Sequence, residues 1–388
     1  MKLTCKSSIL KESIAIVERA ISNRSTLPTL ENIFFDLTET ELTLRGNDLE
    51  IGIEHRVPIT DVQETGQVLI KANTISHIMS KLGNETVSIA VDEHSKATIQ
   101  SGQVDFELLG AQTSDYPAFP SIESGIRLST TVEQLSGLIK DTLFAVSTDE
   151  TKQFLNGILV KNEGDSIVFV STDGYRLAIR KEGFGTESGD FSVIIPNKAM
   201  SELNKIIQGK QSTDHITINI SQTQVAFQMD RFLLIARVIQ GQFPDYTKVL
   251  PQTTENDYQL SRRQLLSACE RASIIASAAN NVIRFIFSDN QLTIKAQAPG
   301  TGEFKESLTV SRSVGTNDQT KIAFNVKLIV DALRHMDSDD VMVAFNSELS
   351  PCVIRPITDD LFTYIVMPIR MSDYEKAAEP ETSAAVSA

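Results

Sequence analysis

Thr172-Asp173-Gly174 is a short motif whose residue types could support catalysis. An aspartate can act as a general base, and a neighbouring hydroxyl suggests a hydrolase site. Such a site also needs a clustered general acid or a metal, and the sequence offers neither beside Asp173. Because Asp-Gly pairs occur far more often in turns, the structural interpretation is favoured over the catalytic one.

The other residues that bind metals or catalyse reactions are scattered. The sequence contains no GxxxxGK[ST], HExxH or GxSxG motif, and the histidines have no paired ligand spacing: His55, His77, His94, His215 and His335. Cys5, Cys269 and Cys352 are far apart and form no CxxC motif, which favours a reducing compartment and small, buried roles. We therefore expect no catalytic residues, no cofactor and no metal.

The candidate turn belongs to a predicted hairpin, Phe154 to Ile179. Residues 155–160 and 166–171 are rich in Ile, Leu, Val and Phe, which suit strands, and residues 162–165 supply turn chemistry. A third strand, Arg176 to Ile179, is predicted after the Asp-Gly turn. The motif is therefore expected at the end of a sheet.

The order of predicted elements around this hairpin occurs three times. Amphipathic helices are predicted near residues 7, 131 and 261, with Ser7 or Ser8 and later Ser261 as N-caps. Second helices are predicted to open at Asn73, Asn197 and Asn325. Hairpins and strands follow each helix in the same order. Two separate helix series with nearly equal spacing indicate an internal repeat.

The fold class predicted is therefore α+β, with three tandem copies of one domain, each with two helices on one face of antiparallel sheets. The domains are placed at 1–122, 123–252 and 253–371, and residues 372–388 are expected to be a disordered tail because they are rich in Ala, Glu, Ser and Pro. Three unrelated α+β domains with a similar element order are the alternative. No apolar run is long enough for a membrane span, so a cytoplasmic protein is expected.

The net charge of −14 argues against a protein that simply coats nucleic acid. The predicted helices nevertheless carry a net positive charge, while the remaining segments are strongly acidic. Lys and Arg are good helix formers, so these residues could merely solvate the outer face. The functional interpretation is that the helices present a mildly positive surface to a polyanion without reading its sequence.

Several separated motifs resemble those of the bacterial DNA sliding clamps, the β subunit of DNA polymerase III. The resemblance covers about residues 1 to 371 and rests on Arg24 with Leu27-Pro28-Thr29-Leu30, Phe154-Leu155-Asn156-Gly157, Thr172-Asp173-Gly174-Tyr175-Arg176-Leu177, Phe243-Pro244-Asp245-Tyr246 and Tyr364-Ile365-Val366-Met367-Pro368-Ile369-Arg370. Each motif is weak alone. Their order on a threefold repeat makes the combination specific.

This resemblance implies three clamp domains per chain and a head-to-tail ring dimer that encircles duplex DNA without sequence specificity. It implies a non-catalytic processivity factor, loaded by a clamp loader, which tethers DNA polymerase subunits and repair proteins through short peptides. The basic helix residues would then face the DNA: Arg24, Lys11, Arg19, Lys81, Lys140, Lys198, Lys205, Arg263 and Arg271.

The resemblance also implies a peptide-binding cleft on the middle and third domains. Its predicted residues are Leu155, Thr172, Gly174, Tyr175, Arg176, Leu177, Pro244, Lys248, Val249, Val366, Met367, Pro368, Ile369, Arg370 and Met371. Apolar side chains and a methionine would adapt to short apolar peptides, and Arg176 or Arg370 could orient their polar ends. Pro351 departs from the family pattern at the edge of this cleft, and the 372–388 tail would either shield it or hang free.

The dimer interface would join the first domain of one chain to the third domain of the other. Phe106 and Leu108 would meet Ile274 and Ile275, two adjacent isoleucines that one helix face does not readily bury together. Core packing of one isoleucine is the alternative. Two other functions remain open: a monomeric peptide-binding scaffold, and a hydrolase centred on Asp173.

Overall fold

The computed structural model describes residues 1–22, 27–83, 85–122, 124–183, 189–288, 290–314 and 320–370, with the backbone alone for 312–314. Two compact units divide the chain. Unit 1 comprises Met1–Ser136 and Phe184–Gln240, and unit 2 comprises Gly137–Gly183 and Gly241–Ala388. We describe each unit by itself.

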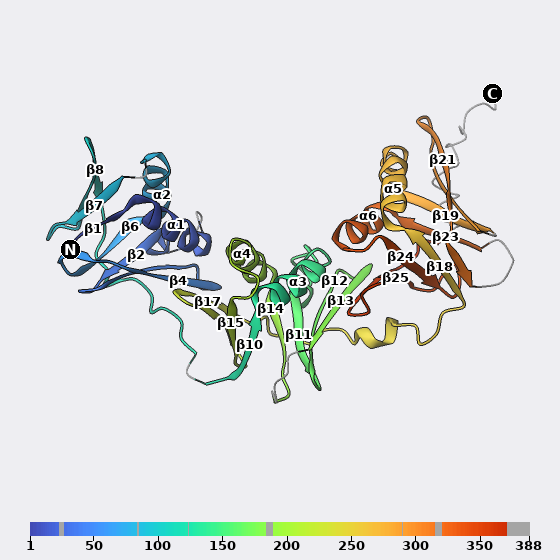
Figure 1. Cartoon of the computed structure of the whole chain (residues 1–388), viewed down its shortest axis with the longest axis horizontal. Helices are drawn as coiled ribbons and strands as arrows, with labels where there is room; N and C mark the ends of the chain where they lie inside the picture. Colours follow the sequence, from blue (N-terminus) through green and yellow to red (C-terminus); the bar gives the residue numbers. More distant parts are fainter. Residues whose placement is uncertain are drawn as a thin grey trace, which may run out of the picture. The chain divides into compact units, whose positions relative to one another are not determined.

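Unit 1 places helices on two antiparallel sheets (Figure 1). Its helices are α1 (Ser7–Val17), α2 (Ala72–Lys81), α4 (Asn197–Ile207) and the start of α3 (Val132–Leu143), with 3-10 turns η1 (Glu18–Ala20) and η2 (Pro28–Glu31). One sheet has the order β5-β1-β7-β8-β9, from β1 (Lys2–Lys6), β5 (Asp61–Glu64), β7 (Thr86–Val91), β8 (Lys96–Ser101) and β9 (Val104–Leu109).

The second sheet of unit 1 crosses from the first repeat into the middle one. Its order is β10-β15-β16-β17-β4-β3-β2-β6, from β2 (Asn32–Leu37), β3 (Glu41–Asn47), β4 (Ile51–Pro58), β6 (Gly66–Lys71), β10 (Ile126–Thr131), β15 (His215–Ile220), β16 (Gln224–Met229) and β17 (Phe232–Arg237). The strand β14 (Ser192–Pro196) completes this unit. Pairing of β4 with β17, from Ile51 opposite Ala236 to His55 opposite Phe232, makes the sheet continuous.

Unit 2 repeats this construction. It holds α5 (Arg262–Ala276), α6 (Val326–His335), the rest of α3, and 3-10 turns η3 (Gln153–Leu155) and η4 (Tyr246–Val249). One sheet contains, in order, β11 (Gly157–Glu163), β12 (Ser166–Thr172), β13 (Arg176–Gly183), β26 (Phe362–Val366), β25 (Cys352–Pro356), β24 (Asp340–Phe345), β18 (Asn256–Ser261) and β22 (Arg312–Val314). The other contains β21 (Gly302–Thr309), β20 (Gln291–Ala298), β19 (Val282–Ser288) and β23 (Thr320–Asn325), in that order.

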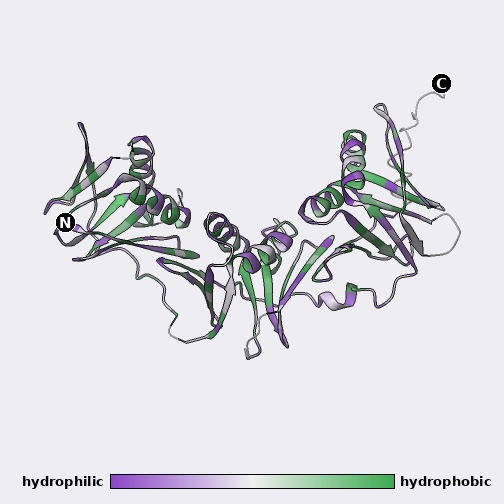
Figure 2. Ribbon diagram, in the orientation of Figure 1, coloured by the Kyte–Doolittle hydropathy of each residue, from purple (hydrophilic) through white to green (hydrophobic). Residues whose placement is uncertain are grey.

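The apolar periodicity of each helix explains its position on a sheet. In α1, Leu10, Ile14 and Val17 are buried, and Ile75 and Met79 of α2 are fully buried. Each such side chain contributes roughly 1.5–3 kcal/mol through burial. Figure 2 shows the resulting alternation of hydrophobic and hydrophilic residues on the helices. The α+β prediction with repeated helix pairs is confirmed.

Several helix starts differ from the prediction. Ser7 is the first helical residue rather than a cap, because its backbone N–H donates to the Glu85 carbonyl at 3.0 Å. Asn325 does cap α6 and accepts from the Lys327 N–H, whereas Asn197 is already helical. Ser261 occupies the cap position of α5 but its side chain makes no capping hydrogen bond. At the start of α1, a tertiary hydrogen bond thus replaces the local cap.

The hairpin prediction was correct in type and wrong at its ends. β11 extends through Asn162 and Glu163, and only Gly164 and Asp165 form the turn before β12 begins at Ser166. Leu155 lies in η3 rather than in a strand. Cross-strand pairing outweighs the polar character of residues 162 and 163.

Among the described residues, none of the helices combines the length and apolarity needed to cross a membrane. Cys269 and Cys352 are buried as expected, but Cys5 is only half-buried, and burial raises the pKa of Cys5 to about 11. Residues 372–388, the expected tail, lie outside the described residues. The three domain boundaries remain predictions.

Candidate peptide surface, DNA-facing cations and edge strands

The Asp173 carboxylate, which could have acted as a base, instead accepts hydrogen bonds within the Thr172–Arg176 turn. Asp173 Oδ1 accepts the backbone N–H groups of Tyr175 at 2.9 Å and Arg176 at 3.0 Å, and its Oδ2 accepts from Arg176 Nε at 3.0 Å. Thr172 Oγ1 accepts from the Gly174 N–H, and Gly174 has a φ of 92°. Asp173 therefore holds a turn, and no group of three or more potential metal ligands occurs among the described residues.

Arg176 ties this turn to helix α6. Its guanidinium donates to Asp331 at 2.8 Å and lies 5.6 Å from the centre of the Phe144 ring. Only 11% of the side chain is exposed, and its Nε also donates to Asp173 at 3.0 Å. Two carboxylates already engage the charge of Arg176 in this conformation, and its role in orienting a bound peptide stays a prediction.

The seam between β13 and β26 brings two predicted segments together. Arg176 pairs with Val366 and Leu177 with Ile365, after which the Met367 N–H donates to the Tyr175 carbonyl at 2.9 Å. The Ile369 N–H then donates to the Ala323 carbonyl at 2.8 Å. Residues 367–369 therefore continue from the seam along the surface of the same unit.

The linker 241–249 supplies the third segment. Asp245 accepts from the Thr247 N–H and caps η4, while the buried Tyr246 hydroxyl donates to Glu163 of β11 at 3.1 Å. The Lys161 ammonium lies 4.7 Å from the centre of the Tyr246 ring. A Cβ at Gly241 would lie 3.3 Å from Phe154 Cβ, so the linker begins close to the segment that precedes β11.

Glu163 holds the linker through its charge and its hydrogen bonds. Partial burial acts to raise its pKa, but hydrogen bonds from Lys161 and Lys181 outweigh that effect and lower the pKa to about 2. The carboxylate thus remains charged and fixes the linker over a wide pH range.

The described residues of the predicted cleft form a mixed surface. Tyr175 is 69% exposed, Val249 is 37% exposed, and Met367, Pro368 and Ile369 are half-buried. Lys248, with 80% of its side chain exposed, and the exposed Arg370 add positive charge. We call the set Tyr175, Pro244, Lys248, Val249 and 367–370 the peptide surface.

Three predicted cleft residues lie beneath this surface. Leu155 and Leu177 are each 4% exposed, and Val366 is fully buried in the core of the third repeat. Their side chains shape the surface from below instead of presenting area to solvent. Met371 lies outside the described residues. No local sequence pattern indicated the role of Asp331, which pairs with Arg176 from a distant helix.

The predicted DNA-facing cations divide into two groups. Lys11, Lys81, Lys140 and Arg263 are exposed and have no ion pair among the residues that the structure describes. The others are held by carboxylates: Arg19 and Lys205 both by Glu202, Lys198 by Asp48, and Arg271 by Glu306. Arg24 lies outside the described residues. The available positive charge is therefore smaller than a count of Lys and Arg suggests.

The predicted interface residues lie at a sheet edge and on a helix. β9 is an edge strand of its sheet, and its Phe106 and Leu108 are half-buried. Ile274 of α5 is 71% exposed, whereas Ile275 packs partly against the core. The sequence interpretation missed Leu109, which is 88% exposed at the end of β9 and follows Leu108 directly.

Comparison with known proteins identifies the family. Models of the N-terminal, central and C-terminal domains of the DNA polymerase III beta subunit match residues 1–120, 130–245 and 247–370. The beta sliding clamp of Synechocystis is 32% identical, covering 96% of this chain and all of that protein, and that of Staphylococcus epidermidis is 33% identical, covering 95% and 99%.

Solved structures agree with this assignment over the same length. The DNA polymerase sliding clamp of Bacillus subtilis superimposes with a TM-score of 0.90 at 29% identity, covering 95% of this chain and 99% of that chain. The beta subunit from Thermotoga maritima gives a TM-score of 0.89 at 26% identity, with coverage of 95% and 99%. The chain therefore belongs to the family of DNA polymerase III beta subunits, the bacterial sliding clamps.

Proposed function

We propose that two copies of this chain close head to tail into a ring around duplex DNA and that the ring tethers DNA polymerases, the clamp loader and repair proteins through the peptide surface. Membership of the sliding clamp family over nearly the whole chain carries this proposal. The protein is a non-catalytic processivity factor that works in the cytoplasm, where bacterial DNA is replicated.

The distribution of charge supports encirclement. Exposed cations project from the helices, while the whole chain has a net charge of −14. Few unpaired cations, with others already held by Glu202 or Glu306, would contact phosphates weakly. Weak contacts suit a ring that stays on DNA by topology and slides along it.

Unpaired sheet edges support the head-to-tail contact. β9 of unit 1 and β21 of unit 2 each lie at the edge of a sheet and can accept another strand. Exposed Val104 and Leu109 on β9, and Ile274 near β21's sheet on α5, provide apolar area for the contact. We place β9 of one copy beside the third repeat of the other.

Retention on DNA tests the central claim. Loaded protein should remain on a closed circular duplex and leave after the circle is cut once, because a cut end releases a ring. Equal retention on the circular and cut DNA would contradict encirclement.

The dimer contact has its own test. The double variant Ile274→Asp with Leu109→Asp should sediment as a monomer, and a dimer of undiminished stability would contradict the assigned contact.

A further inference from the structure

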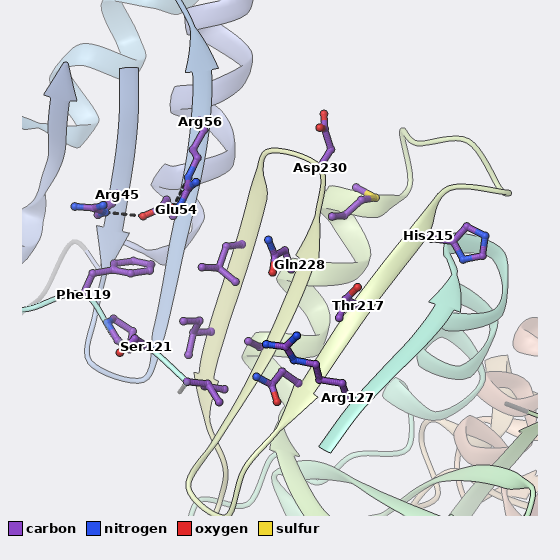
Figure 3. A pocket seen from close by; sticks show the side chains of 17 residues that line it. Arg45, Glu54, Arg56, Phe119, Ser121, Arg127, His215, Thr217, Gln228 and Asp230 are labelled. Carbon is purple, nitrogen blue, oxygen red and sulfur yellow. Dashed lines mark hydrogen bonds and ion pairs between the residues drawn. The ribbon is translucent and has the colours of Figure 1, made fainter. Parts of the chain in front are cut away.

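Unit 1 contains a groove that the proposed function does not use. It has a volume of about 820 Å³ and lies on the sheet face opposite to helix α1 (Figure 3). Along β4, Glu54 and Arg56 point into it, whereas His55 between them lines a separate pocket with Ile9 and Ile16 of α1. The linker 119–122 forms one wall, and β15, β16 and β17 form the floor.

The arginines of the groove differ in how their charge is used. Arg45 donates to Glu54 at 2.7 Å and lies against the rings of Phe34 and Phe119, so it is a structural residue. Glu54 also accepts from Arg56 at 2.8 Å, but half of the Arg56 side chain remains exposed.

Arg127 supplies charge that is still available. It is exposed on β10 and has no ion pair among the residues that the structure describes. His215 lies on the paired strand β15, opposite Thr131. On a chain with a net charge of −14, this groove therefore combines two exposed guanidinium groups with an imidazole.

The floor of the groove is mixed, with Thr217, Asn219 and Gln228 as its polar side chains and an apolar strip beside them. Leu233 and Ile235 of β17 face it, with Ala226 and Met229 of β16 and Ile122 of the linker. A nucleic acid would favour a continuous track of cations, whereas here Glu54 and Asp230 interrupt the charge. A peptide that carries carboxylates on both sides of an apolar side chain matches the lining better.

The position of the groove matches that of the peptide surface on unit 2. Both adjoin a seam between repeats, β4 with β17 and β13 with β26, and a linker crosses the outer face of each. The side chains differ: strand register places Glu54 where unit 2 has Ile179, and Arg56 where it has Lys181. The two sites are built in the same way, but the groove has a more charged lining, which indicates that it binds a different class of peptide.

From these observations we propose that the groove between β4, β17 and the 119–122 linker is a second docking site, which binds a short acidic peptide of a partner protein. Arg127 and Arg56 would pair with the carboxylates, and Leu233 and Ile235 would contact an apolar side chain between them. The lining of the groove carries this inference, so it holds whether or not the peptide surface on unit 2 is correctly assigned.

Fluorescence anisotropy with a labelled peptide, acetyl-EDLFDE-amide, tests the proposal on the full chain. We expect saturable binding with a Kd of about 100 µM or below at low salt, weakened by added salt. Arg127→Glu should raise the Kd at least about tenfold, which corresponds to about 1.4 kcal/mol. Arg127→Gln should raise it less. Thermal unfolding will show whether each variant keeps the fold.

Two controls make the result decisive. Arg237→Glu changes an exposed arginine of β17 that does not line the groove, so the Kd should stay unchanged. A charge-reversed peptide, acetyl-KKLFKK-amide, should not bind the groove. Three outcomes would overturn the proposal. The acidic peptide would not bind at 1 mM, which is about tenfold above the expected Kd; Arg127→Glu and Arg237→Glu would weaken its binding equally; or both peptides would bind equally well. Tyr175→Ala with Met367→Ala should leave acidic-peptide binding intact, which separates this site from the peptide surface.

Discussion

The two seams between repeats share one backbone design. In unit 1, Asp48 accepts the N–H groups of Glu50 and Ile51, and the Arg237 N–H donates to the Glu50 carbonyl at 2.9 Å. In unit 2, Asp173 accepts the equivalent N–H groups, and Met367 donates to Tyr175 at the same distance. A residue with positive φ completes each turn, Leu49 at 75° and Gly174 at 92°.

The side chains that cover the two seams differ. At Gly52 of unit 1, a Cβ would lie 3.0 Å from the Phe119 ring and 3.1 Å from Pro120, so the linker fills the space directly over Gly52, while Glu54 and Arg56 farther along β4 line the open groove. At the equivalent position unit 2 has Leu177, two residues after the exposed Tyr175. The turn end of the same ladder can thus be covered by the chain's own linker, as at Gly52, or left uncovered, depending on a few side chains.

We expect the largest difference between the two seams in their contribution to peptide binding. Tyr175→Ala with Met367→Ala should weaken binding of a clamp-binding polymerase peptide about 100-fold or more, because two apolar contacts are removed. Calorimetric titration measures the affinity. The matched change in unit 1, Glu50→Ala with Arg237→Ala, should leave it unchanged. Equal losses in both variants would show that the seams do not differ as described.

A substitution at Gly52 tests how the linker covers this end of the first seam. Gly52→Leu introduces the side chain of unit 2 under the Phe119 ring and should destabilise unit 1 by about 2 kcal/mol through overpacking. Combining it with Phe119→Ala should restore part of that loss. Chemical denaturation of both single variants and the double variant measures the coupling. Strict additivity would mean that Phe119 does not pack over Gly52.

Acidification should affect the two seams in opposite directions. His55 and Arg180 occupy equivalent positions, opposite Phe232 and Phe362. Burial lowers the pKa of His55, so unit 1 should lose stability as the pH falls below about 6.5, where the unfolded chain binds the proton more tightly.

Beside Arg180, burial raises the pKa of Asp141 to about 6, and the nearby guanidinium only partly offsets this. The folded unit 2 therefore binds that proton more tightly than the unfolded chain, and the contribution of Asp141 to its stability should rise by about 2 kcal/mol as the pH falls from about 7 to 4. Hydrogen exchange of peptides from each unit measures both trends. His55→Gln and Asp141→Asn should each abolish the corresponding difference, and an unaltered pH profile would refute the assignment.

The smallest expected effect concerns the positive φ of the two turns. Leu49→Gly should stabilise unit 1 by about 1 kcal/mol, whereas Gly174→Leu should destabilise unit 2 by a similar amount. A Cβ at Gly174 meets no atom within 4 Å, so steric crowding does not contribute. Shifts in melting temperature of opposite sign would bear this out. Shifts of the same sign would show that exposed apolar area, not backbone strain, dominates.

Local patterns predicted the parts of this molecule that depend on nearby residues. Helical periodicity identified the buried faces of α1 and α2, and the Asp-Gly pair identified the turn at Asp173. The cap at Ser7 failed because its partner, the Glu85 carbonyl, is distant in the sequence. Neutralisation of Arg19 by Glu202 was missed for the same reason.

The candidate peptide surface depended on the family resemblance, because its segments meet only through long-range pairing. Nothing local to Val366 indicates that it pairs with Arg176 and is buried. The groove over β4 and β17 was also missed, since Arg127, Arg56 and Leu233 belong to three strands that hydrogen bonding joins only in the folded sheet.

The continuous ladder between β4 and β17 affects how the protein can be divided for study. A recombinant fragment that ends at residue 122 would lack β17 and expose one side of β4, eight residues long, as a bare edge. Exposed edges of this kind promote aggregation. The segments that evolution repeated are therefore not the segments that can be expressed separately, and soluble fragments would need to keep β17 with the first repeat and β26 with the hairpin that ends in β13.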